Sequence, residues 1–396
     1  MKVGFVIPWI QRTGGNKTVL SVAEGLARGG HDVQLFCHTV RTDLVPEIER
    51  QIGGATFSYA VRSERSYEGH RDDLSWQLPS RRYRRLAETI LAAHRGAPFD
   101  AVIVVANEGR QLGRQLRHAL PRPQPLFGWS IMELIDHSFL LSRERDLPWL
   151  RSLLSPVYPA AHWAWGRSMR DFDFLCANSE WTSDLVGYLY GLECGHILVS
   201  LPEEAFGPGP GSGDLPPGPY IAVPTVSLGP REQGLLAEVA SQGLNLVSFG
   251  PRPAPGVPHL GYLSEERLRE VLRGAAATLF LFDYEALGLI PFESLAVGTP
   301  VVTLPKYGVH VQWRESPYVE FAGTARGLAE ACRRRLLGPP TVADRESARA
   351  SVDRFRASRA AASLVSYLEE VRSVKEALDG ASAGREHALD SAKGAD

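Results

Sequence analysis

Two glutamates separated by seven residues, Glu285 and Glu293, have the spacing in this chain that most suggests chemistry. Gly288-Leu289 lies between them, and Pro291 is suited to the first position of a helix. Backbone N–H groups at a helix N-terminus attract anions such as a diphosphate, and Gly288 lets the backbone approach that ligand closely. Carboxylates beside such a site accept hydrogen bonds from the adjacent hydroxyls of sugar rings. We therefore predict that Glu285 faces a sugar and Glu293 faces a ribose.

The same pair, considered alone, also has a plain structural interpretation. Glu293 favours the first turn of its helix electrostatically and Glu285 is merely solvated, with contributions of about 0.3–1 kcal/mol each. Glutamate pairs of this kind are common on helical surfaces. The surrounding elements are needed to decide between the two interpretations.

The elements predicted around the pair form a strand, loop, helix and strand. An apolar strand at Thr278–Phe282 precedes Glu285, a helix at Pro291–Ala296 carries Glu293, and Gly298 leads into a strand at Pro300–Leu304. Similar alternation runs through most of the chain and is typical of α/β proteins with parallel sheets. Further strands are predicted at Ala101–Val105, Pro125–Trp129, Phe172–Cys176, Ile197–Ser200, Tyr220–Val223, Asn245–Phe249 and His259–Tyr262, and further helices at Glu232–Ser241 and Ser264–Leu272.

A comparable unit opens the chain. A buried strand at residues 3–7 is followed by a loop with Gly14-Gly15 and Asn16, and then by a helix at Thr18–Ala27. Paired glycines after a buried strand allow the backbone to approach a phosphate or a sugar. A plain tight turn is the alternative.

A segment rich in glycine and proline at residues 206–218 predicts a linker between two domains. We predict one Rossmann-like domain at residues 1–205 and a second at 219–340, which suits a chain of 396 residues. A helical pattern at 341–378 follows, and the Ala-, Gly- and Ser-rich residues 379–396 are predicted to be a disordered tail.

Composition excludes several classes of protein. Charged residues make up 22% of the chain and the net charge is −2, which does not favour nucleic acid as a partner. The four cysteines form no Cys-x-x-Cys pair, which argues against a disulfide framework and against a zinc site. No signal peptide or membrane-spanning stretch is predicted, so a soluble, cytoplasmic protein is expected.

With its context, the glutamate pair resembles the signature of the retaining glycosyltransferases of GT-B fold, specifically glycosyltransferase family 4 (glycosyl transferases group 1). That signature is Glu, seven residues, Glu, with an internal Gly-Leu and a following Gly-x-Pro-Val-Val. The matching residues are Glu285, Gly288-Leu289, Glu293 and Gly298-Thr299-Pro300-Val301-Val302, supported near the start of the chain by Gly14-Gly15 and Gly30-His31-Asp32-Val33. The resemblance extends to about residue 335.

The resemblance implies two Rossmann-like domains whose parallel sheets face a central cleft, with a C-terminal helix that crosses back to the N-terminal domain. It implies a retaining hexosyl-type transferase that moves a sugar from a nucleotide-diphosphate sugar to an acceptor hydroxyl on a glycan or small molecule. No metal and no cofactor beyond this co-substrate are expected. The catalytic candidates are Glu285, Glu133 and His137, and the donor-binding candidates are Glu293, Gly288, Leu289, Gly14, Gly15, Asn16 and Arg231.

Three of these candidates, Arg231, Glu133 and His137, also have a structural interpretation. Family members carry Gly-Arg and then Lys-Gly after the first strand of the C-terminal domain, to neutralise the diphosphate, whereas here Arg231 is the basic candidate in residues 224–234. A solvated side chain at a helix start is the alternative for Arg231. Glu133 and His137 follow the strand at Pro125–Trp129 and should line the cleft, but a structural role is an equal alternative.

Two other features leave alternatives open. The basic stretch Arg81-Arg82-Tyr83-Arg84-Arg85 could contact an anionic acceptor or a membrane surface, or could be a solvated helix face. An epimerase or hydrolase of nucleotide sugars can share the GT-B architecture. A third hypothesis is a subunit that binds a nucleotide sugar without strong catalysis, because this sequence lacks the family's Gly-Arg and Lys after the first strand of the C-terminal domain.

Overall fold

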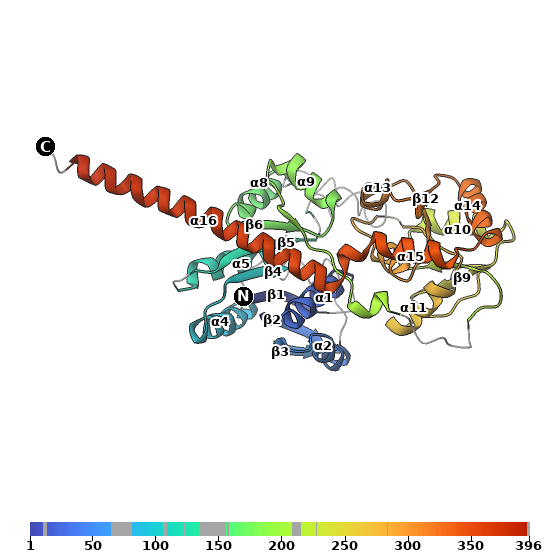
Figure 1. Cartoon of the computed structure of the whole chain (residues 1–396), viewed down its shortest axis with the longest axis horizontal. Helices are drawn as coiled ribbons and strands as arrows, with labels where there is room; N and C mark the ends of the chain where they lie inside the picture. Colours follow the sequence, from blue (N-terminus) through green and yellow to red (C-terminus); the bar gives the residue numbers. More distant parts are fainter. Residues whose placement is uncertain are drawn as a thin grey trace.

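The computed structural model describes residues 1–10, 14–64, 81–105, 109–121, 124–132, 134, 156, 158–207, 215–226, 228–282 and 284–393. Two α/β domains lie side by side along the long axis of the molecule, and the last helix runs across the N-terminal one (Figure 1). The prediction of a parallel sheet in each half of the chain is confirmed.

The N-terminal domain contains, within the described residues, a seven-stranded parallel sheet in the order β3-β2-β1-β4-β5-β6-β7. Its strands are β1 (Lys2–Ile10), β2 (Asp32–Arg41), β3 (Thr56–Ser63), β4 (Ala101–Val105), β5 (Leu126–Ile131), β6 (Phe174–Ala177) and β7 (His196–Ile197). Its helices are α1 (Gly14–Arg28), α2 (Val45–Gln51), α4 (Arg81–Gly96), α5 (Gly109–Ala119), α8 (Tyr158–Met169) and α9 (Glu180–Tyr190), with the 3₁₀ helix η1 (Thr42–Leu44). The 3₁₀ helix η3 (Glu203–Phe206) follows, and its Ala205 and Phe206 pack into the core of the C-terminal domain.

Strand β1 is buried on both faces, as expected of the centre of a parallel sheet. Val3 and Phe5 point into a core shared with α1, whereas Val6 points into the opposite core beneath α4, α5, α8 and α9. Successive strand residues alternate between faces, so the continuous apolar run at the start of the chain fills both cores. The sheet therefore lies between two layers of helices.

The C-terminal domain has a smaller parallel sheet, of five described strands in the order β12-β11-β10-β8-β9. These are β8 (Ile221–Pro224), β9 (Leu246–Phe249), β10 (Ala277–Phe280), β11 (Val301–Thr303) and β12 (Val319–Phe321). The helices are α10 (Pro230–Ala240), α11 (Glu265–Gly274), α12 (Leu289–Ala296), α13 (Tyr307–Trp313), α14 (Ala325–Leu337) and α15 (Val342–Ser351). Helix α12 follows β10 directly, so the loop between them opens at the carboxyl end of the sheet, the edge at which ligands bind in open α/β domains.

The chain crosses back to the N-terminal domain through η4 (Asp353–Phe355) and α16 (Ala357–Lys393). Ala360, Ala361 and Leu364 of α16 join the core that α1 helps to form. Gly25 of α1 permits this close packing, because a Cβ atom there would lie 2.0 Å from the carbonyl oxygen of Ala357. The predicted crossing of the C-terminal helix is confirmed.

Substituting Gly25 with alanine is expected to destabilise the protein by about 1–3 kcal/mol, since the helices must separate to admit the methyl group. The matched control is Gly234→Ala within α10, where a Cβ atom would meet nothing within 4 Å. There alanine should be neutral or stabilising, by up to about 1 kcal/mol, through its helix propensity. Denaturant unfolding of both variants measures the difference, and equal behaviour of the two would contradict the close packing of α1 on α16.

The C-terminal region differs from the prediction in two respects. The helical pattern from 341 to 378 is interrupted, because Leu201 donates a backbone hydrogen bond to the Phe355 carbonyl at 2.8 Å and Phe355 packs edge-to-face on Phe292. These contacts fix the chain where it passes between domains. Residues 379–393, which the sequence analysis assigned to a tail, continue α16 to Lys393, and that helix extends past the domains (Figure 1). Alanine, arginine, glutamate and lysine are good helix formers, and they outweigh the few small polar residues there.

Two predicted strands are much shorter than expected. His259 forms an isolated bridge to Ser248 instead of a strand, and β7 is confined to His196–Ile197. Of the predicted linker, residues 208–214 lie outside the described part of the chain. Among the described residues, no helix has the length and apolar character required to cross a bilayer.

Candidate active site

A cavity of about 880 Å³ lies between the two domains, within the range typical of small-molecule sites. Both domains line it, and it brings together residues far apart in the sequence. Of the candidates predicted from the sequence, those that line it are Gly14, Gly15, Asn16, Glu285, Gly288, Leu289 and Glu293.

The N-terminus of α12 forms one wall of the cavity. Gly288 is its N-cap residue, with a positive φ of 71°, and a Cβ atom there would lie 2.9 Å from Val309 Cγ2. Both facts favour glycine at this position. The helix begins at Leu289, so Pro291 is its third residue and not the first as predicted. Proline is still tolerated because the N–H groups of the first turn have no partner within a helix. These N–H groups and the helix dipole make this end of α12 attractive to anions.

Glu293 projects into the cavity from α12 and is only 6% exposed. Its carboxylate accepts a hydrogen bond from Lys17 of α1, and Lys17 also contacts Glu265 at the start of α11. Burial raises the pKa of Glu293, and the charge of Lys17 opposes that shift. Burial alone would lower the pKa of Lys17, but the two carboxylates outweigh it and raise that pKa above its ordinary value. The three side chains thus form a charged bridge between the domains.

Glu285 lies in the loop between β10 and α12 and is half-buried. The backbone N–H of Gly308 donates to the Glu285 carbonyl at 3.2 Å. A Cβ atom on Gly308 would lie 1.8 Å from the carbonyl oxygen of Ala286, so the start of α13 packs tightly under this loop. This packing holds Glu285 at the edge of the cavity.

The N-terminus of α1 faces that of α12. Gly14 and Gly15 belong to the first turn of α1 instead of a separate loop. A Cβ atom on Gly14 would lie 2.9 Å from Leu289 Cδ1, and one on Gly15 would lie 2.4 Å from Met132 Sδ. Asn16 is 8% exposed and donates from Nδ2 to the Trp9 carbonyl at 3.2 Å. Two helix N-termini from different domains therefore approach each other across the cavity.

One sequence candidate is not brought to this site, and two others lie outside the described residues. Arg231 is exposed at the start of α10 and is not among the described residues that line the cavity, because α10 presents that position to solvent. The assignment of Arg231 to the donor site is therefore not supported by the geometry. Glu133 and His137 lie outside the described residues, so their roles remain predictions.

Sequence reasoning missed Lys17, Glu265 and Asn178, all of which line the cavity. Asn178 donates to the Met132 carbonyl at 2.8 Å from the junction of β6 and α9. Its place between a strand and a helix was the available signal, because such junctions form the ligand edge of a parallel sheet. Lys17 and Glu265 are 248 positions apart, and their contact depends on how the domains meet.

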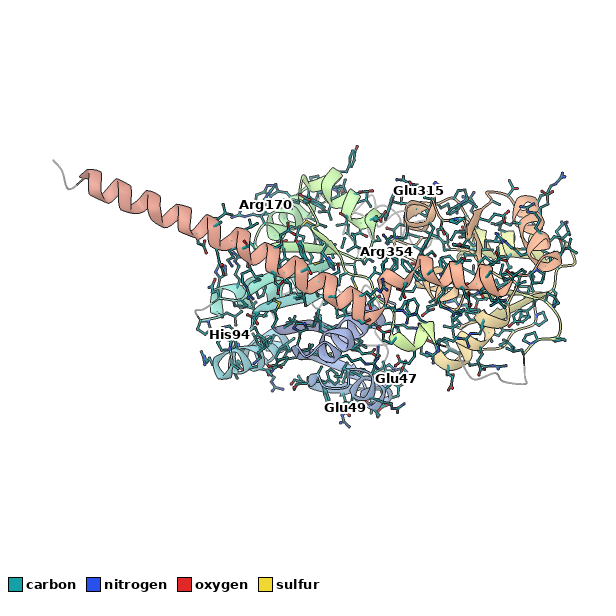
Figure 2. All side chains as sticks on the ribbon, in the orientation of Figure 1. Glu47, Glu49, His94, Arg170, Glu315 and Arg354 are labelled. Atoms are coloured by element: carbon teal, nitrogen blue, oxygen red, sulfur yellow. The ribbon has the colours of Figure 1, made fainter. Side chains whose placement is uncertain are left out.

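The far end of the cavity lies between α1, α2 and η3. It is lined by Glu24 and Arg28 of α1, by Glu204 of η3, and by Glu47, which is labelled on α2 in Figure 2. Glu24 is only 1% exposed, and Arg28 lies 2.9 Å from its carboxylate. Burial raises the pKa of Glu24 from 4.5 to about 7, aided by the negative charge of Glu204 and opposed by Arg28.

Glu24 gives the fold a pH dependence that can be measured. A carboxyl group whose pKa is higher in the folded protein than in the unfolded protein stabilises the fold least when it is ionised. The contribution of Glu24 to the free energy of unfolding therefore falls as the pH rises from 4.5 to about 7. The variant Glu24→Gln is therefore expected to be more stable than the parent at pH 8, by an amount of the order of 3 kcal/mol. The advantage should shrink steadily towards pH 4. A stability difference independent of pH, measured by denaturant unfolding, would contradict the raised pKa.

Comparisons with known proteins cover both domains. Residues 13–199 match the family described as "Glycosyl transferase 4-like domain", and residues 254–348 match "Glycosyl transferases group 1". Together the two matches cover more than two thirds of the chain. No curated protein matches the chain in sequence.

Several solved structures share the fold at low sequence identity. The sucrose-phosphate synthase of Thermosynechococcus elongatus is 15% identical, with a TM-score of 0.69 over 94% of this chain and 100% of that one. A glycosyltransferase from Rickettsia africae is 13% identical, with a TM-score of 0.61 over 93% of this chain and 98% of that one. The N-terminal domain of Candida albicans trehalose-6-phosphate phosphatase is 12% identical, with a TM-score of 0.61 over 93% and 97%. These likenesses show a shared two-domain fold.

Proposed function

Because the chain belongs to the family 4-type glycosyltransferases of GT-B fold, which transfer sugars from nucleotide sugars, we propose that it is a retaining hexosyltransferase whose donor binds in the interdomain cavity. The observation that carries the proposal is the convergence of two glutamates and two helix N-termini in one cavity. Glu285 and Glu293 supply the carboxylates, and α1 and α12 supply the N-termini.

In the proposed complex the donor diphosphate lies at the N-terminus of α12. The dipole and the N–H groups of that end favour the negative charge, and Gly288 leaves room for the phosphate oxygens. Glu293 then accepts hydrogen bonds from the ribose hydroxyls, and Glu285 accepts them from the sugar. The spacing of the two glutamates along loop and helix thus matches the order of ribose, diphosphate and sugar in the donor.

The base of the nucleotide is proposed to lie against β9 and the segment before α11. Phe249, Gly250 and Tyr262 line this part of the cavity. Gly250 has a φ of 127°, and a Cβ atom there would lie 2.7 Å from Thr225 Oγ1, so the backbone turns sharply where the base would approach. The Tyr262 side chain is 63% exposed and can stack on a planar ring.

In the proposed reaction the bond between the sugar C1 and the diphosphate oxygen breaks, and a bond forms from the acceptor oxygen to C1 on the same face. The acceptor proton passes to an oxygen of the departing diphosphate. Negative charge grows on that diphosphate as the bond breaks, and helix N-termini already directed at it lower the barrier. Glu285 and Glu293 act by binding hydroxyls, in contrast with the paired acid and nucleophile of a glycosidase.

The acceptor is proposed to enter from the N-terminal domain, which contributes Met132 and Asn178 to the cavity. Glu133 and His137 remain candidates for contact with the acceptor or the sugar. Contact between a membrane and the basic stretch at residues 81–85 also remains a proposal, supported by the exposure of the Arg84 and Arg85 side chains on α4.

Product analysis tests the proposed reaction. The protein is incubated with a nucleotide sugar that it binds and with a mixture of glycan and small-molecule acceptors, and the anomeric protons are followed by NMR. We expect release of the nucleoside diphosphate together with a glycosylated acceptor of the same anomeric configuration as the donor. An epimerised nucleotide sugar, or free sugar with no glycosylated acceptor, would instead support an epimerase or hydrolase of the same fold. Tight donor binding without turnover would support a binding subunit.

A further inference from the structure

Lys17 occupies a position that the proposed donor complex does not account for. Its ammonium group holds Glu293 and Glu265 together across the cavity, and its side chain is only 19% exposed. Lys17 comes from the N-terminal domain, whereas both carboxylates belong to the C-terminal domain. In the absence of a donor, therefore, the carboxylate assigned to the ribose is already engaged.

Donor binding must change this bridge. When the ribose hydroxyls donate to Glu293, they compete with the ammonium group of Lys17 for the same oxygens. Lys17 is in the first turns of α1, whose N-terminus lies against that of α12, as the crowding of Gly14 by Leu289 shows. The released ammonium group would thus be beside the N-terminus of α12, at which the diphosphate is proposed to lie.

The charges of the site require a cation near the diphosphate. Glu293 and Glu265 would both repel a nucleoside diphosphate if Lys17 were absent. Arg231 does not line the cavity, and Arg28, which does, is paired with Glu24 and Glu204 at the far end. Arg50 of α2 and Arg269 of α11 also line the cavity. Lys17 differs from them in that its ammonium group hydrogen-bonds to Glu293 from the first turn of α1, the helix whose N-terminus faces that of α12.

On the basis of the proposed function, we propose that Lys17 is a donor-binding residue supplied by the N-terminal domain. When a nucleotide sugar binds, the ammonium group of Lys17 gives up its contact with Glu293 and contacts the diphosphate instead. A lysine suits this role because its ammonium group is a compact charge on a flexible stem. The positive charge that contacts the donor diphosphate then comes from the N-terminal domain, whereas the rest of the proposed donor site belongs to the C-terminal domain. Donor binding would therefore add a contact that holds the two domains together.

The experiment compares ligands with and without the diphosphate. Calorimetry of the full chain identifies which of UDP, GDP and ADP binds best, and then measures that nucleotide and its parent nucleoside against Lys17→Ala and Lys17→Arg. We expect Lys17→Ala to weaken the affinity for the nucleoside diphosphate about 30-fold. The affinity for the nucleoside should change by less than about 3-fold, because the nucleoside lacks the diphosphate that Lys17 would contact. Lys17→Arg should restore much of the loss, since the positive charge is kept.

The matched control is Lys375→Ala, which breaks a partly buried ion pair with Asp173 at 3.1 Å on α16, away from the cavity. It should leave both affinities unchanged. If Lys17→Ala weakens the nucleoside and the nucleoside diphosphate equally, or weakens neither, Lys17 does not contact the diphosphate and the inference is overturned while the proposed function stands. If the unmodified protein binds none of these three nucleotides and neither CDP nor dTDP, the proposed donor site itself is wrong.

Discussion

Replacing Glu293 with glutamine is expected to weaken binding of the nucleotide sugar by at least about 100-fold, because two hydrogen bonds from ribose hydroxyls to a charged acceptor are lost or weakened. Glutamine keeps the size of the side chain, so the buried position on α12 stays filled. Alanine at this position should abolish measurable binding. Isothermal calorimetry with the preferred nucleotide sugar measures both variants.

Two further variants separate the ribose contact from the ion pair. Glu265→Gln removes the other carboxylate that Lys17 contacts and is expected to weaken donor binding less than Glu293→Gln does. Glu266→Gln changes an exposed neighbour that is not among the described residues lining the cavity, and it should have no effect. If Glu293→Gln binds the donor as tightly as the unmodified protein does, the assignment of Glu293 to the ribose is wrong.

Replacing Glu285 with glutamine is expected to lower kcat by about 100-fold and to change the donor Kd by much less. The loop carboxylate is proposed to contact the sugar, where charge and geometry change most as the bond to the diphosphate breaks, so its contribution should be larger in the transition state than in the bound donor. Steady-state rates of sugar transfer and calorimetric Kd values give the two quantities separately.

The control for Glu285 is Glu315→Gln, a glutamate labelled in Figure 2 whose side chain is 90% exposed. It should leave kcat and Kd unchanged. A loss of donor affinity as large as the loss of kcat in Glu285→Gln would place that side chain with the ribose or diphosphate instead of the reacting sugar. An unchanged kcat would remove Glu285 from the reaction.

The two sheets and the location of the cavity could be predicted from the sequence, because both depend on conformational preferences of residues that are close together in the chain. The apolar runs of β1 and β10 are long enough for strands, and glycine follows each of them. Gly288 precedes α12 because only a residue tolerant of positive φ continues the chain there, so glycine and helix are predicted together. Local preferences of this kind are visible in a single sequence.

Contacts between the domains could not be predicted in the same way. The bridge from Lys17 to Glu265 and Glu293 joins segments whose proximity depends on how the two domains pack. The interruption of the C-terminal helix at η4 has a similar origin, since Phe355 contacts Leu201 and Phe292, which are distant from it in the sequence but lie in the same core. Arg231 was assigned from its position after β8, but its direction depends on how α10 turns on the sheet.

The bridge also links the two halves of the proposed mechanism. If the donor replaces the contact between Lys17 and Glu293, the energy of binding the nucleotide sugar is used to rearrange an interdomain contact. In the proposed reaction the donor lies on the C-terminal domain and the acceptor on the N-terminal domain, so transfer requires the two domains to hold a suitable relative position. A cation that contacts both domains would couple donor binding to that relative position.

The most direct test of the nucleotide-sugar site is the melting temperature of the full chain with a panel of uridine, guanosine, adenosine, cytidine and thymidine diphosphate sugars. A ligand that binds only the folded protein stabilises it by about 2.7 kcal/mol at 100 times its Kd. We predict a rise of the melting temperature with nucleotide sugars of one base, and no rise with the same ligands for Glu293→Ala. A melting temperature that stays constant with every member of the panel would contradict a nucleotide-sugar site in this cleft.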